Sequence, residues 1–132
     1  MCIRDSIVEL GLQQLQSRHG SRAEDLTAAI GPAIRPCCFE VGAEVYSDFA
    51  AMFPYAGELF TSQHQDAKRH LDLQEANRRQ LRSAGLLEAH IHTIRECTAC
   101  CRTPAGRRKY FSYRAEGGIT GRMLSVIGTT AP

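Results

Sequence analysis

The chain has no tryptophan, only two lysines and no long apolar run among its 132 residues. Because a helix that spans a bilayer needs about 20 consecutive apolar residues, the sequence predicts no membrane span and no membrane partner. No basic region followed by an apolar stretch marks a secretory signal, so we expect a soluble, cytoplasmic protein. Hydrophobic residues make up 43% and charged residues 23%. This composition excludes a disordered tail, a fibre and a coiled-coil rod, and it is typical of one globular domain.

The basic charge is concentrated at the C-terminal end. The net charge is +2, but residues 95–132 carry +5 and residues 1–94 carry −3. Arginine supplies 14 of the 16 basic side chains, and its planar fork suits carboxylate and phosphate oxygens. The C-terminal third could therefore hold an anion, or it could be a solvated basic face. The small overall charge gives no sign of a nucleic-acid partner.

Six cysteines are present, and they do not form a disulfide framework. Adjacent cysteines pair poorly, so reduced thiols are expected. Cys97 and Cys100 have the Cys-x-x-Cys spacing of half a zinc site or of a redox pair. A second pair with that spacing is missing, because Cys37 and Cys38 are adjacent. We therefore favour structural or incidental thiols, leave the metal and redox alternatives open, and assign no metal ligand. The cysteines are Cys2, Cys37, Cys38, Cys97, Cys100 and Cys101.

Two histidines have a spacing that could ligate a metal. His90 and His92 are two residues apart in a segment with strand-like alternation, so both are expected on one side of it. His64 or His70 could provide a third ligand. No neighbouring carboxylate or thiolate completes the set, and two ordinary half-exposed histidines are the favoured interpretation.

The apolar periodicity predicts alternating helices and strands, and hence the α/β class. Asp72 and Glu75 form a near capping box, and Gly85 ends the helix that they begin. The other predicted helices cover residues 7–19 and 42–53. Strands are predicted at residues 26–30, 90–95, 110–114 and 123–127, with a short one near 59–60.

A glycine-rich turn between two arginines is the strongest candidate for chemistry. Arg114 and Arg122 lie on either side of Gly117, Gly118 and Gly121. Glycines allow backbone N–H groups to approach a ligand, and arginines bind anions through charge-assisted hydrogen bonds. The segment is not a Walker loop, because no Gly-Lys-Ser/Thr sequence follows. A flexible hairpin with two surface arginines is an equally good interpretation.

Several segments, taken in order, resemble the laccase-domain family, which is also called multicopper polyphenol oxidase-like, purine nucleoside phosphorylase-like or peptidoglycan editing factor. The first two, at 30–34 and 39–42, resemble an "IGP-x-I…YEVG" signature, with Phe39 where tyrosine is usual. A second arginine is common where this chain has Ala115. The remaining matching segments are 71–73, 76–77, Leu81, Gly85, 97–98, 111–114 and 120–122.

The resemblance implies a layered mixed-sheet α/β domain with helices packed outside, present here as the C-terminal half. Residues 1–6 resemble an adapter-derived scar, so Cys2 and Arg4 are expected to be non-native and the domain to cover residues 7–132. The family's metal ligands belong to Ala-Asp-Cys and His-Ala-Gly-Trp-Arg-Gly segments that this chain lacks. A parent protein would hold zinc or copper, whereas this chain alone is expected to hold no metal and to be inactive.

The implied activity is metal-dependent purine nucleoside phosphorolysis, with adenosine deaminase and methylthioadenosine phosphorylase activities. The implied partners are a purine nucleoside and phosphate, and the oligomeric state stays open. Copper-dependent phenol oxidation and a non-enzymatic binding module or inactive fragment are the alternatives. The residues expected to bind substrate or phosphate are Arg114, Arg122, Ser112, Tyr113, Thr120, Gly31, Cys97 and Thr98, and the catalytic residues are expected upstream.

Overall fold

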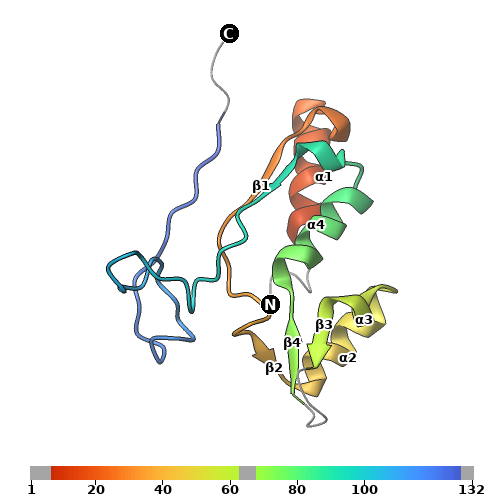
Figure 1. Cartoon of the computed structure of the whole chain (residues 1–132). Coiled ribbons are helices and arrows are strands. Elements are labelled where there is room, and N and C mark those ends of the chain that lie inside the picture. Colours follow the sequence, from red (N-terminus) through yellow and green to blue (C-terminus); the bar gives the residue numbers. More distant parts are fainter. Residues whose placement is uncertain (1–6, 63–67, 129–132) are drawn as a thin grey trace.

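The computed structural model describes residues 7–62 and 68–128. The adapter-like segment 1–6 and His64 lie outside these residues. Two small sheets are packed with helices (Figure 1), which confirms the predicted mixed α/β class. Among the described residues, no helix has the length and apolar character needed to span a bilayer.

The first sheet is a parallel pair formed by residues that are distant in the sequence. Strand β1 (Ala28–Ile30) pairs with β5 (Ile91–Thr93), with Ala28 opposite Ile91. Helices α1 (Ile7–His19) and α4 (Leu73–Ser83) lie side by side against this pair (Figure 1). Their buried contact contains Leu12, Leu81 and Leu86. The predicted strands are confirmed, although each is shorter than expected, and His90 belongs to the 3-10 turn η2 (Glu88–His90).

The second sheet is antiparallel, with the order β2-β4-β3. Its strands are β2 (Glu40–Val41), β4 (Arg69–Leu71) and β3 (Phe60–Ser62). Helices α2 (Ala43–Met52) and α3 (Ala56–Leu59) pack with them. A second 3-10 turn, η1, covers Ala23–Asp25. The core residues of this part are Phe49, Ala56, Leu59, Leu71 and Ala76, each at most 2% exposed.

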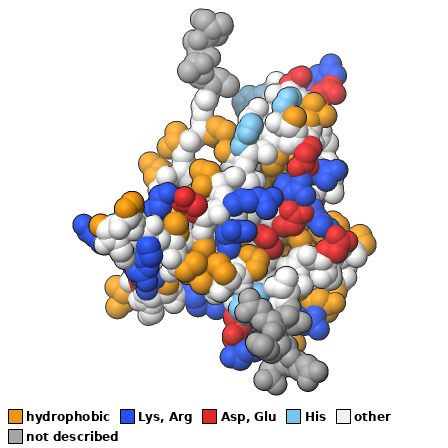
Figure 2. Space-filling model, viewed as in Figure 1, with side chains coloured by type: hydrophobic (Ala, Val, Ile, Leu, Met, Phe, Trp, Pro, Cys, Tyr) orange, Lys and Arg blue, Asp and Glu red, His pale blue; other side chains and the backbone are white. Residues whose placement is uncertain are grey.

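Helix α4 begins and ends as its sequence predicts. The Asp72 carboxylate accepts a hydrogen bond of 2.9 Å from the Glu75 backbone N–H, and Gly85 ends the helix with φ at +99°. Glu75 also binds Arg78 and Arg79 through its carboxylate. Acidic and basic side chains consequently intermix across the middle of the face shown in Figure 2.

The predicted strands at 110–114 and 123–127 are wrong. Residues 112–118 form successive turns, in which the Ser112 carbonyl accepts from Glu116 N–H at 2.9 Å. The segment from Met123 to Ile127 is extended but unpaired within the described part of the chain, and Leu124 and Val126 are 89% and 84% exposed. Alternating apolar residues form a strand only where a neighbouring strand takes up their backbone hydrogen bonds, and no described strand lies along either segment.

Candidate functional site

A hollow of about 280 Å³ lies between the segment that joins β1 to β2 and the long loop that follows β5. It brings together Thr98, Ser112, Tyr113 and Arg114, four of the residues expected to bind substrate. The remaining lining residues are apolar: Ile34, Phe39 and Phe111. A hollow with apolar walls and a few polar groups is typical of a small-molecule site.

The loop end that carries Thr98 is held by a continuation of the parallel sheet. Ala33 and Cys97 form a parallel bridge, and the Thr98 N–H donates to the Ala33 carbonyl at 3.0 Å. Thr98 is 6% exposed. Its position is therefore fixed by backbone pairing at the carboxyl ends of β1 and β5, where ligands commonly bind in parallel sheets.

Ser112 is buried at the start of a turn and stabilises that turn. Its hydroxyl oxygen accepts from the Ala115 N–H at 3.4 Å, and its own N–H donates to the Glu116 carboxylate at 3.2 Å. The neighbouring Thr120 hydroxyl and the Ser112 N–H lower the pKa of Glu116. Thr120 is not one of the residues that line the hollow.

Arg114 connects the loop to the antiparallel sheet. Its Nη1 donates to the Glu40 carbonyl at 3.1 Å, and its guanidinium carbon lies 5.4 Å from the centre of the Phe39 ring. The side chain is exposed, and a guanidinium has five N–H donors. Within the described residues, the Glu40 carbonyl is the hydrogen-bond acceptor found for this side chain.

Two other expected site residues lie away from the hollow's lining. Arg122 is exposed and does not line it. The Gly31 carbonyl accepts from Gln74 Nε2 at 2.8 Å, so this glycine connects the first sheet to α4. The apolar walls formed by Ile34 and Phe111 were not among the predicted site residues, because only the fold brings these two segments to one hollow.

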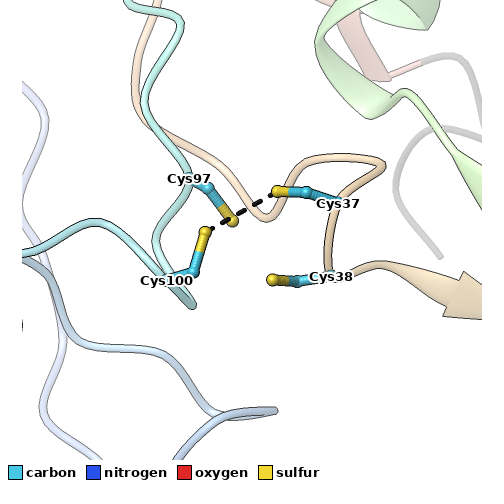
Figure 3. A group of neighbouring side chains, drawn as sticks. All are labelled: Cys37, Cys38, Cys97 and Cys100. Atoms are coloured by element: carbon cyan, nitrogen blue, oxygen red, sulfur yellow. Dashed lines mark hydrogen bonds between the residues drawn. The ribbon is translucent and has the colours of Figure 1, made fainter.

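Four cysteines meet beside the hollow. The Sγ atoms of Cys37, Cys38, Cys97 and Cys100 all lie within 4.8 Å of one another (Figure 3). Cys97 is buried, which by itself would raise its thiol pKa, but N–H groups of Arg35, Ala99 and Cys100 outweigh burial and lower the pKa to about 6.

The pKa values of the neighbouring thiols are shifted in the opposite direction. Burial and the surrounding cysteines raise the pKa of Cys37, and they raise that of Cys38 to about 11. A lowered pKa beside raised ones is the pattern expected where thiols share one negative charge.

The described histidines do not form a comparable group with one another. His70 is engaged through Nδ1 with the Pro36 carbonyl. His90 lies in η2 and His92 in β5.

The structure is that of a mixed α/β protein with a hollow beyond the carboxyl ends of a parallel strand pair. Residues 2–130 match the family described as multi-copper polyphenol oxidoreductase laccase, and the chain belongs to this family. The resemblance seen in the sequence motifs is thereby confirmed.

The relatives carry the names of nucleoside enzymes. A protein named purine nucleoside phosphorylase YlmD, from Geobacillus stearothermophilus, is 38% identical over 113 residues, which cover 86% of this chain and 39% of that protein. A protein named adenosine deaminase RL5, from an unknown prokaryotic organism, is 34% identical over 110 residues, 83% of this chain and 40% of that protein. The crystal structure of YlmD from G. stearothermophilus has a TM-score of 0.77 and 32% identity, covering 90% of this chain and 42% of that one. This chain thus spans about 40% of the length of these relatives.

The copper centres that the family description implies do not fit the described residues. Multi-copper sites require clustered histidines, and the described histidines form no group that could hold a metal ion. The described cluster consists of thiols alone.

Proposed function

We propose that this chain supplies the phosphate- and nucleoside-binding loops of a purine nucleoside phosphorylase. The observation that carries the proposal is the hollow in which Thr98, Ser112 and Arg114 meet the aromatic rings of Phe39 and Phe111. Both the phosphorylase and the deaminase named among the relatives act on purine nucleosides. The same pocket would also bind adenosine for deamination and methylthioadenosine for phosphorolysis.

Each kind of lining group has a role in phosphorolysis. An aromatic ring such as Phe39 or Phe111 packs against a purine, and the hydroxyls of Thr98 and Ser112 bond to ribose or phosphate oxygens. Arg114 holds phosphate through charge-assisted hydrogen bonds. A phosphate oxygen then attacks the anomeric carbon, the carbon–nitrogen bond to the purine breaks, and the leaving base takes the electron pair and a proton. Fixed cationic donors favour this step because they hold the phosphate anion beside the oxocarbenium-like ribosyl centre, whose positive charge the anion stabilises.

We also propose that the chain is the C-terminal half of a longer protein. Its coverage of about 40% of the relatives supports this, as does the exposure of Leu124 and Val126. Under this proposal the catalytic metal, zinc or copper, is held by the remainder of the protein and would activate a nucleophile. The chain alone would then show no turnover. Copper-dependent phenol oxidation is the alternative activity of such a longer protein, and the described residues of this chain supply no histidine group for it.

The proposal is tested in a chimera in which this chain replaces the matching segment of G. stearothermophilus YlmD. Phosphate-dependent release of hypoxanthine from inosine is measured for the chimera and for Arg114→Ala and Arg122→Ala. Loss of a charge-assisted hydrogen bond should reduce kcat/KM for phosphate about 10- to 100-fold in Arg114→Ala. Adenosine and methylthioadenosine are assayed in parallel.

Arg18→Ala is the matched control, because Arg18 is an exposed arginine on α1, away from the hollow. It should keep the activity of the parent chimera. Undiminished activity in both Arg114→Ala and Arg122→Ala would reject the anion site, and phosphate-independent release of the base would reject phosphorolysis.

A further inference from the structure

The four clustered cysteines come from two loops that begin at the same end of the parallel sheet. Cys37 and Cys38 lie in a tight turn in which the Arg35 carbonyl accepts from the Cys38 N–H at 2.8 Å. Cys97 and Cys100 lie in the loop after β5, which the Ala33–Cys97 bridge joins to the first loop. The side chains from both loops point toward one another in Figure 3. The fold therefore supplies the second cysteine pair that the spacing along the chain does not.

The sulfur positions match a tetrahedral metal site. Zinc–thiolate bonds of about 2.3 Å give a tetrahedron with sulfur–sulfur edges of about 3.8 Å. The Sγ atoms of Cys37 and Cys100 are 3.7 Å apart, and none of the four is more than 4.8 Å from another. A disulfide needs about 2.05 Å between two sulfurs and would leave the other two thiols unused.

The surroundings suit a negatively charged metal–thiolate group. The Arg35 N–H donates to Cys97 Sγ at 3.5 Å, and the N–H groups of Ala99 and Cys100 also point to this sulfur. Hydrogen bonds of this kind orient and stabilise thiolate ligands. Zinc with four thiolates carries a charge of −2, and residues 95–132, which include two of the ligands, carry +5.

We propose that Cys37, Cys38, Cys97 and Cys100 form a tetrathiolate site for one structural zinc ion. Zinc replaces the thiol protons, which leave to solvent, and no oxidant or reductant is needed. Because Cys37 and Cys100 are exposed, the ion has a path to the site. Four protein ligands close the coordination sphere, so the site is structural and not catalytic. The proposal replaces the expectation that this chain alone holds no metal.

The bound ion would tie together the two loops that form the hollow. Cys38 precedes Phe39 and Cys97 precedes Thr98, and both of these neighbours line the hollow. In the described part of the chain these loops are otherwise connected by the Ala33 bridge with its Thr98 hydrogen bond and by Arg35, which donates to Cys97 Sγ and to the Arg95 carbonyl. Zinc removal is therefore expected to loosen residues 97–114 and leave α1 and α4 in place.

The test measures metal content in the full chain purified under reducing conditions. Elemental analysis should find one zinc per chain. Removal of zinc followed by titration with cobalt(II) should give thiolate-to-cobalt charge transfer and the strong visible bands of tetrahedral coordination, saturating at one equivalent. This titration uses the unaltered chain, so it does not depend on whether a variant folds.

The variants Cys37→Ser and Cys100→Ser should lose the stoichiometric zinc. Cys101→Ser is the matched control and should keep it, because Cys101 is a free, half-buried cysteine beside the cluster but outside it. The proposal is overturned by a reduced chain that binds neither zinc nor cobalt, or by zinc that survives the double substitution of Cys37 and Cys100. Copper in place of zinc, or a Cys37–Cys100 disulfide in the absence of metal, would overturn it as well.

Discussion

Glu75 is predicted to be the carboxylate that contributes most to acid-sensitive stability in α4. It binds Arg78 through Nε at 2.8 Å and Nη2 at 2.9 Å, and it binds Arg79 Nε at 2.8 Å. These hydrogen bonds lower its pKa from the ordinary 4.5 to about 2, against a smaller opposing effect of burial. The three side chains are only 21–24% exposed. At about 1.4 kcal/mol per factor of ten, the full shift corresponds to about 3 kcal/mol, which screening at this partly open site reduces to about 1–2 kcal/mol.

The contribution of Glu75 to the free energy of unfolding should decrease as the pH falls. A carboxylate whose folded pKa is lowered stabilises the fold fully above its ordinary pKa of 4.5, and that stability is lost as the pH falls through the folded pKa of about 2. Glu75→Gln should therefore lower the free energy of unfolding by about 1–2 kcal/mol at neutral pH, and by almost nothing near pH 2.

Urea unfolding followed by far-ultraviolet circular dichroism measures this difference. Glu9→Gln, an exposed glutamate in the first turn of α1, provides the matched control and should change stability little. The reasoning is refuted if Glu75→Gln is as stable as the parent at neutral pH, or if the difference persists unchanged near pH 2.

Three further substitutions test the packing and the turns. Leu71→Ala removes a fully buried side chain and should cost about 2–4 kcal/mol in urea unfolding; a cost below about 1 kcal/mol would contradict the described core. Gly85→Ala places a Cβ at φ +99° and 3.1 Å from the Cβ of Ala23. The free energy of unfolding should therefore fall by about 1 kcal/mol, which thermal unfolding would show as a lower melting temperature. Ser112→Ala removes the acceptor of the Ala115 N–H, and this amide should then exchange its hydrogen faster, whereas unchanged exchange would contradict the turn.

Local signals predicted the helices well. Asp72 caps α4 through its carboxylate and Gly85 ends it in the left-handed region, so both boundaries follow from short-range chemistry. The helix predicted at 42–53 is α2 (Ala43–Met52), one residue shorter at each end. The short helix α3 was not predicted from the sequence, and its buried residues are Ala56 and Leu59. Its formation depends on tertiary packing, which a single sequence does not display.

The candidate site was only partly predictable for the same reason. The motifs identified Thr98 and Arg114, which the fold brings to one hollow, but they also included Arg122 and Gly31, which do not line it. The cysteine cluster joins residues that are 63 positions apart. The parallel pairing of β1 with β5 places the loops that follow these strands together. The spacing of the cysteines along the chain therefore could not reveal that four of them cluster.

The occupancy of the hollow is tested most directly by nuclear magnetic resonance of the isotopically labelled chain titrated with phosphate and then with inosine. The account predicts chemical-shift changes concentrated at Thr98 and at residues 111–114, with the phosphate response lost in Arg114→Ala and retained in Arg18→Ala. Changes confined to residues outside the hollow, or a phosphate response that survives Arg114→Ala, would contradict it.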